Sequence, residues 1–270
     1  MDTGVTNGDL LGRIEEYYDA VPRSGARFED FGPLALFAKE GAGWPYYARP
    51  TLGWSGPFAV EDVRRVRARQ RELGIPESFE WVAETTPLLR AAVEESGLTV
   101  HEYPLMVLDP NAPATAVAND AGVRILGPDD AVLPSAIFVT HLAFAEPGTQ
   151  IGIAGLPQLV EMTAAGDDSV ERVRDRIRAG LTVVAAAVEN GLALCGGQHQ
   201  TVGQVSEIVG IGTLPAARRR GLGLAVTAAL LADAQARGIQ TIFMTAGDDD
   251  VARIYARLGF RRIATALIAE

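Results

Sequence analysis

The sequence is poor in the residues on which several classes of protein depend. Its 270 residues include one cysteine, which excludes an internal disulfide, and only three histidines. Neither Cys195 nor His199 has the spacing of metal ligands, so we expect no metal. We find no apolar run long enough to cross a membrane and no secretory signal pattern. These absences predict a cytoplasmic protein without a membrane partner.

Basic residues are also scarce. The chain has 24 Lys and Arg against 34 Asp and Glu, a formal net charge of −10. That balance argues against a nucleic-acid partner and is compatible with a cationic or neutral ligand. With 48% hydrophobic residues, the chain can build one large core or two small ones.

The most informative stretch runs from Ser206 to Gly223. Residues 205–213 combine β-branched residues with glycines, which predicts a strand buried on both faces. Glu207 stands inside that strand, where a carboxylate is costly unless it is paired, solvated by a cleft or protonated. Two interpretations stay open for Glu207: a catalytic base with a raised pKa, or a structural carboxylate paired with a core arginine.

A glycine turn and a helix follow this strand. Pro215 ends the strand, and Gly221 and Gly223 allow a tight turn with backbone N–H groups near a ligand. Residues 222–237 are strong helix formers, and Gly238 stands where a helix commonly ends. The helix N-terminus and the three arginines 218–220 therefore predict a diphosphate site. The alternative is a solvated basic turn.

Two common phosphate-binding motifs do not fit this turn. No Gly-Lys-Ser or Gly-Lys-Thr occurs in the chain, so a Walker loop is excluded. The spacing Gly221-x-Gly223-x-x-Val226 places Val where a dinucleotide-binding Rossmann fold needs a third glycine.

The remaining pattern resembles the GNAT superfamily of acyl-CoA-dependent N-acetyltransferases. Its signature, Arg/Gln-x-x-Gly-x-Gly/Ala, is met by Arg218, Gly221 and Gly223. The resemblance implies an α/β fold of the α+β type, with a mixed, mostly antiparallel central sheet flanked by helices. It also implies that the strand backbone binds pantetheine and the loop binds pyrophosphate. The implied cofactor-binding residues are Ile211, Gly212, Thr213, Arg218, Arg219, Arg220, Gly221, Leu222, Gly223 and Leu224.

Two catalytic residues follow from the same resemblance. Glu207 stands eleven residues before Arg218, the position of the general base in the histone-modifying branch of the family. Downstream, a strand at 241–246, a helix at 248–260 and a strand at 262–268 resemble the family's ending, Tyr-x-x-x-Gly-Phe. Tyr255 falls where these enzymes often place the proton donor to the CoA thiolate; the alternative is a packed aromatic on the last helix. Asp248 replaces a cofactor-contacting Asn; we include it among the cofactor residues, although its carboxylate suits a helix N-cap equally well.

The implied activity is direct transfer of an acetyl group from acetyl-CoA, the cosubstrate, to a primary amine in a ternary complex. The acceptor is a small-molecule or peptide amine, and a homodimer is possible. Two alternatives stay open: a CoA-bound sensor without turnover, and an enzyme that uses a longer acyl-CoA.

The signature covers only the last quarter of the chain. A complete GNAT-like domain is expected at 120–270, after a linker at 113–119. Its upstream elements are a strand at 122–126, helices at 129–144 and 169–179, and strands at 181–189 and 192–198. Residues 145–166 are rich in Gly and Pro, and we expect them to form a long segment that shapes a pocket. We expect His199 to face the cleft or to lie at a hairpin edge.

The N-terminal half shows a similar order of elements. A helix at 60–75, a strand at 78–83, a helix at 87–95 and a strand at 99–108 echo the C-terminal end. We predict a partial, degenerate GNAT-like domain at 1–112 that lacks the basic turn. An unrelated α+β domain is the alternative.

Overall fold

The computed structural model describes residues 6–41, 45–112 and 121–270. The predicted linker, 113–119, lies outside these residues. The chain divides into two compact units. Unit 1 comprises residues 1–106, 245–252 and 262–270, and unit 2 comprises residues 107–244 and 253–261. The domain ranges inferred from the sequence stay predictions; the structure adds that two C-terminal segments belong to unit 1.

Unit 2 contains a sheet with the strand order β10-β9-β8-β7-β6. All neighbours in it are antiparallel except β9 and β10, which are parallel. Its strands are β6 (Gly122–Leu126), β7 (Thr182–Glu189), β8 (Leu192–Val202), β9 (Val205–Thr213) and β10 (Thr241–Thr245). Its helices are α4 (Leu133–Ala145), α5 (Leu156–Ala165), α6 (Ser169–Arg178), α7 (Leu222–Ala236) and the end of α8 (Asp249–Ala256).

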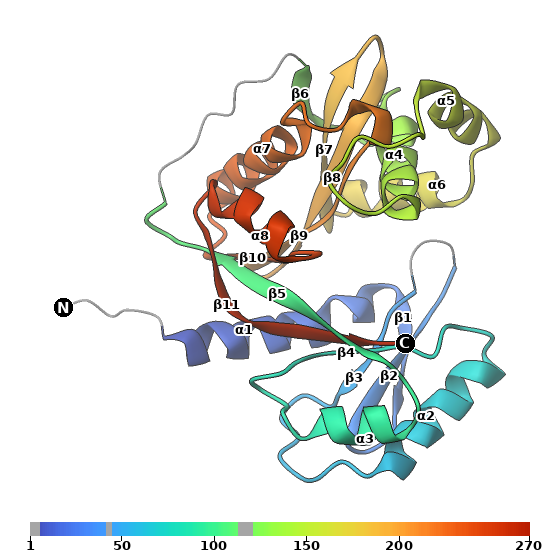
Figure 1. The fold of residues 1–270 in the computed structure, drawn as a ribbon, viewed down its shortest axis with the longest axis vertical. Helices are drawn as coiled ribbons and strands as arrows, with labels where there is room; N and C mark the ends of the chain where they lie inside the picture. The colour runs from blue at the N-terminus through green and yellow to red at the C-terminus, as the bar shows by residue number, and fades with distance from the viewer. Residues whose placement is uncertain (1–5, 42–44, 113–120) are drawn as a thin grey trace. The chain divides into compact units, whose positions relative to one another are not determined.

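Helices α4 and α7 lie on opposite sides of this sheet (Figure 1). Glycines allow α4 to approach closely: a Cβ at Gly196 would stand 2.2 Å from the Ala136 carbonyl oxygen, and one at Gly212 would stand 2.8 Å from Thr140 Cα. On the other face, Gly197 leaves room for Ile211, whose Cδ1 would be 2.2 Å from an added Cβ. Gly196 and Gly212 therefore set how near α4 comes to β8 and β9, and Gly197 makes room for the Ile211 side chain on the face of α7.

Unit 1 is built on the strand order β1-β2-β3-β4-β11-β5. These strands are β1 (Ala26–Asp30), β2 (Leu34–Lys39), β3 (Ala48–Pro50), β4 (Phe79–Val82), β5 (Val100–Leu108) and β11 (Phe260–Ala269). Its helices are α1 (Asn7–Ala20), α2 (Val60–Glu72) and α3 (Leu89–Glu95). Short 3₁₀ turns, η1 (Pro22–Ser24) in unit 1 and η2 (Pro215–Ala217) in unit 2, complete the elements.

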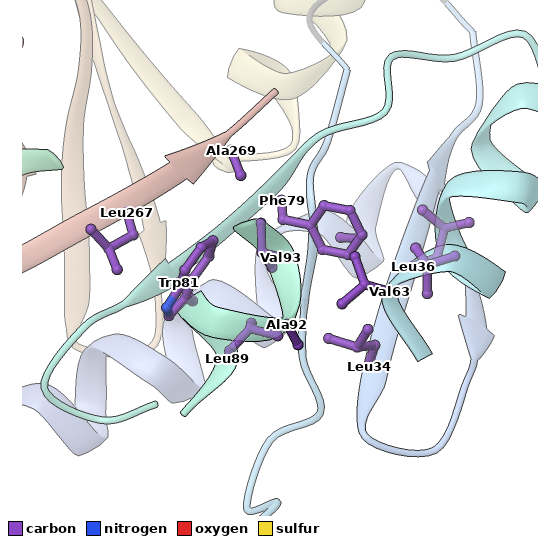
Figure 2. Packing of buried hydrophobic residues seen from close by; sticks show 12 residues of the cluster. Leu34, Leu36, Val63, Phe79, Trp81, Leu89, Ala92, Val93, Leu267 and Ala269 are labelled. Atoms are coloured by element: carbon purple, nitrogen blue, oxygen red, sulfur yellow. The ribbon is translucent and has the colours of Figure 1, made fainter. Parts of the chain in front are cut away.

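The core of unit 1 lies between its sheet and helices α2 and α3. Phe79 and Trp81 of β4 point into it and meet Val63 of α2 and Leu89 and Val93 of α3 (Figure 2). Because side chains alternate along a strand, Glu80 lies on the opposite face, where it forms a 2.8 Å ion pair with Arg49. The Arg49 guanidinium stacks on Tyr18, which places α1 on that second face.

The mixed, mostly antiparallel sheet flanked by helices confirms the predicted fold class. The predicted pocket-forming segment, residues 145–166, contains a helix that the sequence analysis did not place, because α5 occupies Leu156–Ala165. Pro157 stands in the first turn of α5, where a proline favours the start of a helix rather than a break. Within the described residues, no helix is long and apolar enough to span a bilayer.

Candidate functional site

Strands β9 and β10 pair over only three residues. Thr241, Ile242 and Phe243 of β10 face Val205, Ser206 and Glu207 of β9, and the pairing stops there. β9 continues to Thr213 and stays paired with β8 on its other side. Past Glu207, the β10-facing edge of β9 is therefore available for backbone hydrogen bonds to a ligand.

A β-bulge interrupts β9 just beyond Glu207. The β8–β9 register shifts between Gly196 and Gln198, so that Gly210 and Ile211 oppose a single β8 residue. Gly210 has φ +65°, a left-handed conformation that glycine adopts at little cost. The bulge turns the backbone around Ile211, one of the predicted pantetheine-binding residues.

The glycine turn leads directly into the uncapped N-terminus of α7. Arg219 (φ 69°) and Gly221 (φ 75°) are both left-handed, and no side chain caps the helix. The first helical bond runs from the Ala225 N–H to the Gly221 carbonyl at 3.1 Å. The N–H groups of Leu222, Gly223 and Leu224 therefore have no acceptor within the helix, which is the arrangement that binds anions.

The three signature arginines have different surroundings. Arg218 donates to the carbonyl oxygens of Gln150 (3.1 Å), Ala143 (3.1 Å) and Glu146. Its guanidinium thus ties the turn to the C-terminal end of α4, where the helix dipole favours a cation. Arg220 forms a 2.6 Å ion pair with Glu189. Arg219 is exposed. A phosphate contact by any of the three side chains stays a prediction.

The predicted pantetheine-binding residues alternate across β9. Gly212 faces α4, and Ile211 and Thr213 face α7, where both lie near Gly223. The Thr213 hydroxyl donates to the buried thiol of Cys195 at 3.3 Å, and burial raises the pKa of that thiol to about 12. Cys195 is therefore a neutral, inert core residue.

Tyr255 is buried near the N-terminal end of α7. Thr227 and Cys195 both lie close enough to the Tyr255 hydroxyl to affect its ionisation. Burial is the largest of the effects that raise the pKa of Tyr255, so the phenol keeps its proton at neutral pH. The Thr227 hydroxyl donates to the Gly223 carbonyl at 2.8 Å. Thr227 escaped notice in the sequence; its only signal was a polar residue within an apolar helix.

Glu207 and Asp248 occupy different settings. Glu207 is half-buried at the last β9 position paired with β10, where the two strands part. The Asp248 carboxylate accepts the Val251 N–H at 2.7 Å, so Asp248 caps α8, as its residue type allows. The catalytic role of Glu207 and the cofactor role of Asp248 stay predictions.

His199 is neither cleft-facing nor at a hairpin edge, so that expectation was wrong. It is 1% exposed, with Nδ1 2.9 Å from Ser206 Oγ and Nε2 3.0 Å from Asp233 Oδ2. Burial lowers the pKa of His199, and the bond to Asp233 opposes that shift. Arg237 pairs with the same Asp233 oxygen at 2.5 Å. The network joins β8, β9 and α7.

No cluster of three or more His, Cys, Asp or Glu side chains suited to a metal is found in the part of the chain that the structure describes.

A family model described as FR47-like protein matches residues 183–268, which include the whole signature. No curated protein matches the chain. Among solved structures, a GCN5-related N-acetyltransferase from Kribbella flavida is similar, with a TM-score of 0.67 and 22% identity over 96% of this chain and 94% of that one. A functionally unknown conserved protein from Staphylococcus epidermidis is also similar, with a TM-score of 0.54 and 15% identity over 91% of this chain and 92% of that one.

At these identities the structural matches establish only the fold. The Kribbella flavida structure matches 96% of this chain, which includes residues of both units. The family model adds an independent match on sequence over the strands and helices of the site. The motif, the parting strands and the segment that matches the FR47-like model lie in the same part of the chain, and the chain has the fold of a GCN5-related N-acetyltransferase.

Proposed function

We propose that this protein is an acyl-CoA-dependent N-acetyltransferase that moves an acetyl group from acetyl-CoA to a primary amine within a ternary complex. One observation carries the proposal. β9 parts from β10 after Glu207, and the turn that follows presents the free N–H groups of Leu222, Gly223 and Leu224. An extended amide-bearing chain with a terminal diphosphate, such as pantetheine with its pyrophosphate, suits this pair of features.

In the proposed reaction, the amine nitrogen attacks the thioester carbon, a C–N bond forms and the C–S bond breaks. An amine is protonated at neutral pH, so a base must remove a proton first, and we assign this role to Glu207. An amide at the β9 bulge near Ile211 stabilises the oxyanion. Tyr255 gives the departing sulfur its proton, in keeping with a phenol that burial keeps neutral. The second proton that the nitrogen loses as the amide forms restores the phenol.

Two glycines of identical conformation provide the test of the cofactor site. Gly221 (φ 75°) precedes α7 and Gly238 (φ 76°) follows it, and neither has an atom within 4 Å of an added Cβ. Asp at either position brings the same strain and the same charge, but only Gly221→Asp places a carboxylate beside the proposed pyrophosphate site. We expect calorimetry to show acetyl-CoA binding in the wild type and in Gly238→Asp, and its loss in Gly221→Asp.

Thiol release in the presence of an amine panel then separates enzyme from sensor. Turnover supports the transferase, whereas binding without turnover on any amine supports a CoA sensor. Equal acetyl-CoA affinity in both Asp variants contradicts the assignment of the turn. A comparison of acetyl-CoA with longer acyl-CoA donors tests the remaining alternative. The cytoplasmic location, the absence of a nucleic-acid partner, the homodimer and the degenerate GNAT-like N-terminal half stay predictions.

A further inference from the structure

One short segment of unit 2 exposes an unusual amount of apolar side chain. Of the ten large apolar residues that are exposed among the described residues, five lie between positions 144 and 160. We call these five the apolar segment: Phe144 (50% exposed), Ile151 (65%), Ile153 (90%), Leu156 (45%) and Val160 (50%). Leu156 and Val160 stand four apart on α5 and so share one face of it. Exposed apolar groups gathered in this way mark a binding surface.

Hydrogen bonds hold the backbone of this segment on both sides. The Glu146 carboxylate accepts the N–H groups of Ile153 (2.8 Å) and Ala154 (3.2 Å). These backbone bonds are the largest of the effects that lower the pKa of Glu146, so the carboxylate stays ionised. An added Cβ at Gly152 would overlap the Glu146 carboxylate and stand 2.8 Å from Pro215, so only glycine fits there. Ile151 and Ile153 therefore project from an ordered backbone.

The same segment is attached to the proposed cofactor turn. The Gly152 N–H donates to the Pro215 carbonyl, and the Ala216 N–H donates to the Ala154 carbonyl, both at 3.0 Å. Arg218 adds its bond to the Gln150 carbonyl. Pro215 and Ala216 form the 3₁₀ turn directly before the arginines, so the apolar side chains stand beside the residues that would hold acetyl-CoA.

Charge narrows the class of ligand. Residues 144–168 contain no Lys, Arg or His, and their charged residues are Glu146, Glu161, Asp167 and Asp168. Arg218 is the basic residue bonded to this segment, and its guanidinium donates to the backbone carbonyls of Gln150, Ala143 and Glu146. The segment's own carboxylates therefore disfavour an anionic ligand and favour a cation that carries an apolar group.

We propose that the apolar segment binds the apolar group of the acceptor, and that the acceptor class is a small primary amine with an alkyl or aryl chain. This inference rests on the proposed function, because it assumes that an amine meets acetyl-CoA at the Arg218–Gly223 turn.

The probes are n-hexylamine and ethylamine, which differ only in methylene groups. Binding of each to the full-length protein is measured by calorimetry with CoA present, so that no turnover is needed. We expect n-hexylamine to bind at least about tenfold more tightly than ethylamine, and Ile151→Ser and Ile153→Ser each to weaken n-hexylamine binding about tenfold. Leu88→Ser is the control, because Leu88 is an exposed apolar residue (66%) of unit 1. Leu88→Ser should leave the affinity for n-hexylamine unchanged.

Acetyl-CoA affinity, measured separately, distinguishes the two possible failures. If the wild type does not bind acetyl-CoA, the proposed function falls. If acetyl-CoA binds normally but n-hexylamine affinity equals that of ethylamine, or is unchanged by both Ile substitutions, only the present proposal falls. Ile-dependent binding of a peptide with an apolar N-terminal residue but not of n-hexylamine overturns the small-amine class. Dimerisation that Ile153→Ser abolishes identifies the segment as a self-association surface and also overturns the proposal.

Discussion

Replacement of Gly196 by alanine tests whether glycine sets the distance between α4 and the sheet that carries the site. The new Cβ would stand 2.2 Å from the Ala136 carbonyl oxygen, 3.1 Å from its carbonyl carbon and 3.3 Å from Val139 Cγ1. These are backbone and core atoms, so no flexible side chain can turn aside. The helix would have to retreat by about 1 Å to restore ordinary contact.

A backbone shift of this kind in a packed core costs about 1–3 kcal/mol of unfolding free energy. Urea unfolding, followed by both circular dichroism and tryptophan fluorescence, measures the loss, and coincident curves justify the two-state analysis. Gly127→Ala is the control in the same unit, since no atom lies within 4 Å of a Cβ there and its φ is not positive. It should stay within about 0.5 kcal/mol of the wild type. A Gly196→Ala protein as stable as Gly127→Ala would refute the close-approach argument.

The other predictions concern backbone strain, acid stability and catalysis. Arg219→Gly should raise the unfolding free energy, measured in urea, by about 0.5–1 kcal/mol, because glycine adopts the left-handed conformation without the strain of an arginine. If the Arg219 side chain contacts phosphate, the same substitution should weaken acetyl-CoA binding, which calorimetry measures. Because the pKa of His199 is lowered in the folded state, the unfolded chain binds more protons, and unfolding free energy should fall as the pH drops below 6.5. His199→Gln should flatten that slope between pH 7.5 and 5.5, and an unchanged slope would exclude His199 as its source. Tyr255→Phe should lower kcat about 100-fold while calorimetry shows unchanged acetyl-CoA affinity, and a wild-type kcat would remove Tyr255 from the mechanism. Glu207→Gln should flatten the limb of the pH–rate profile that rises toward alkaline pH. An unchanged profile would exclude Glu207 as the base.

Local patterns were enough to place the elements around the signature. The strand at 205–213 has the bounds of β9, and the helix at 222–237 differs from α7 by one residue. α5 was missed because its flanking Gly155 and Gly166 read as loop, although Pro157 in a first turn indicates a helix start. No helix or strand was predicted in the first 50 residues. The sequence nevertheless contains a signal for α1, because Thr6 and Asp9 form a capping box at its start.

Long-range partners could not be read in the same way. The residues bonded to Arg218 lie 68 to 75 positions earlier in the chain, and two of the residues bonded to His199, Ser206 and Asp233, lie on β9 and α7. A sequence shows that a buried histidine or a signature arginine needs partners. Only the folded chain identifies them.

The surroundings of Arg218 indicate why an arginine suits the first position of the signature. The turn must leave the N–H groups of α7 free for a ligand, so it cannot be stabilised by capping that helix. Arg218 instead anchors the turn from outside, through carbonyls at the end of α4 on the opposite face of the sheet. A planar guanidinium with five donors can reach several carbonyls at once, whereas a lysine ammonium provides a single point of charge. The free helix end and the anchored turn are therefore two parts of one arrangement, in which stability comes from α4 so that α7 can keep its N-terminus open.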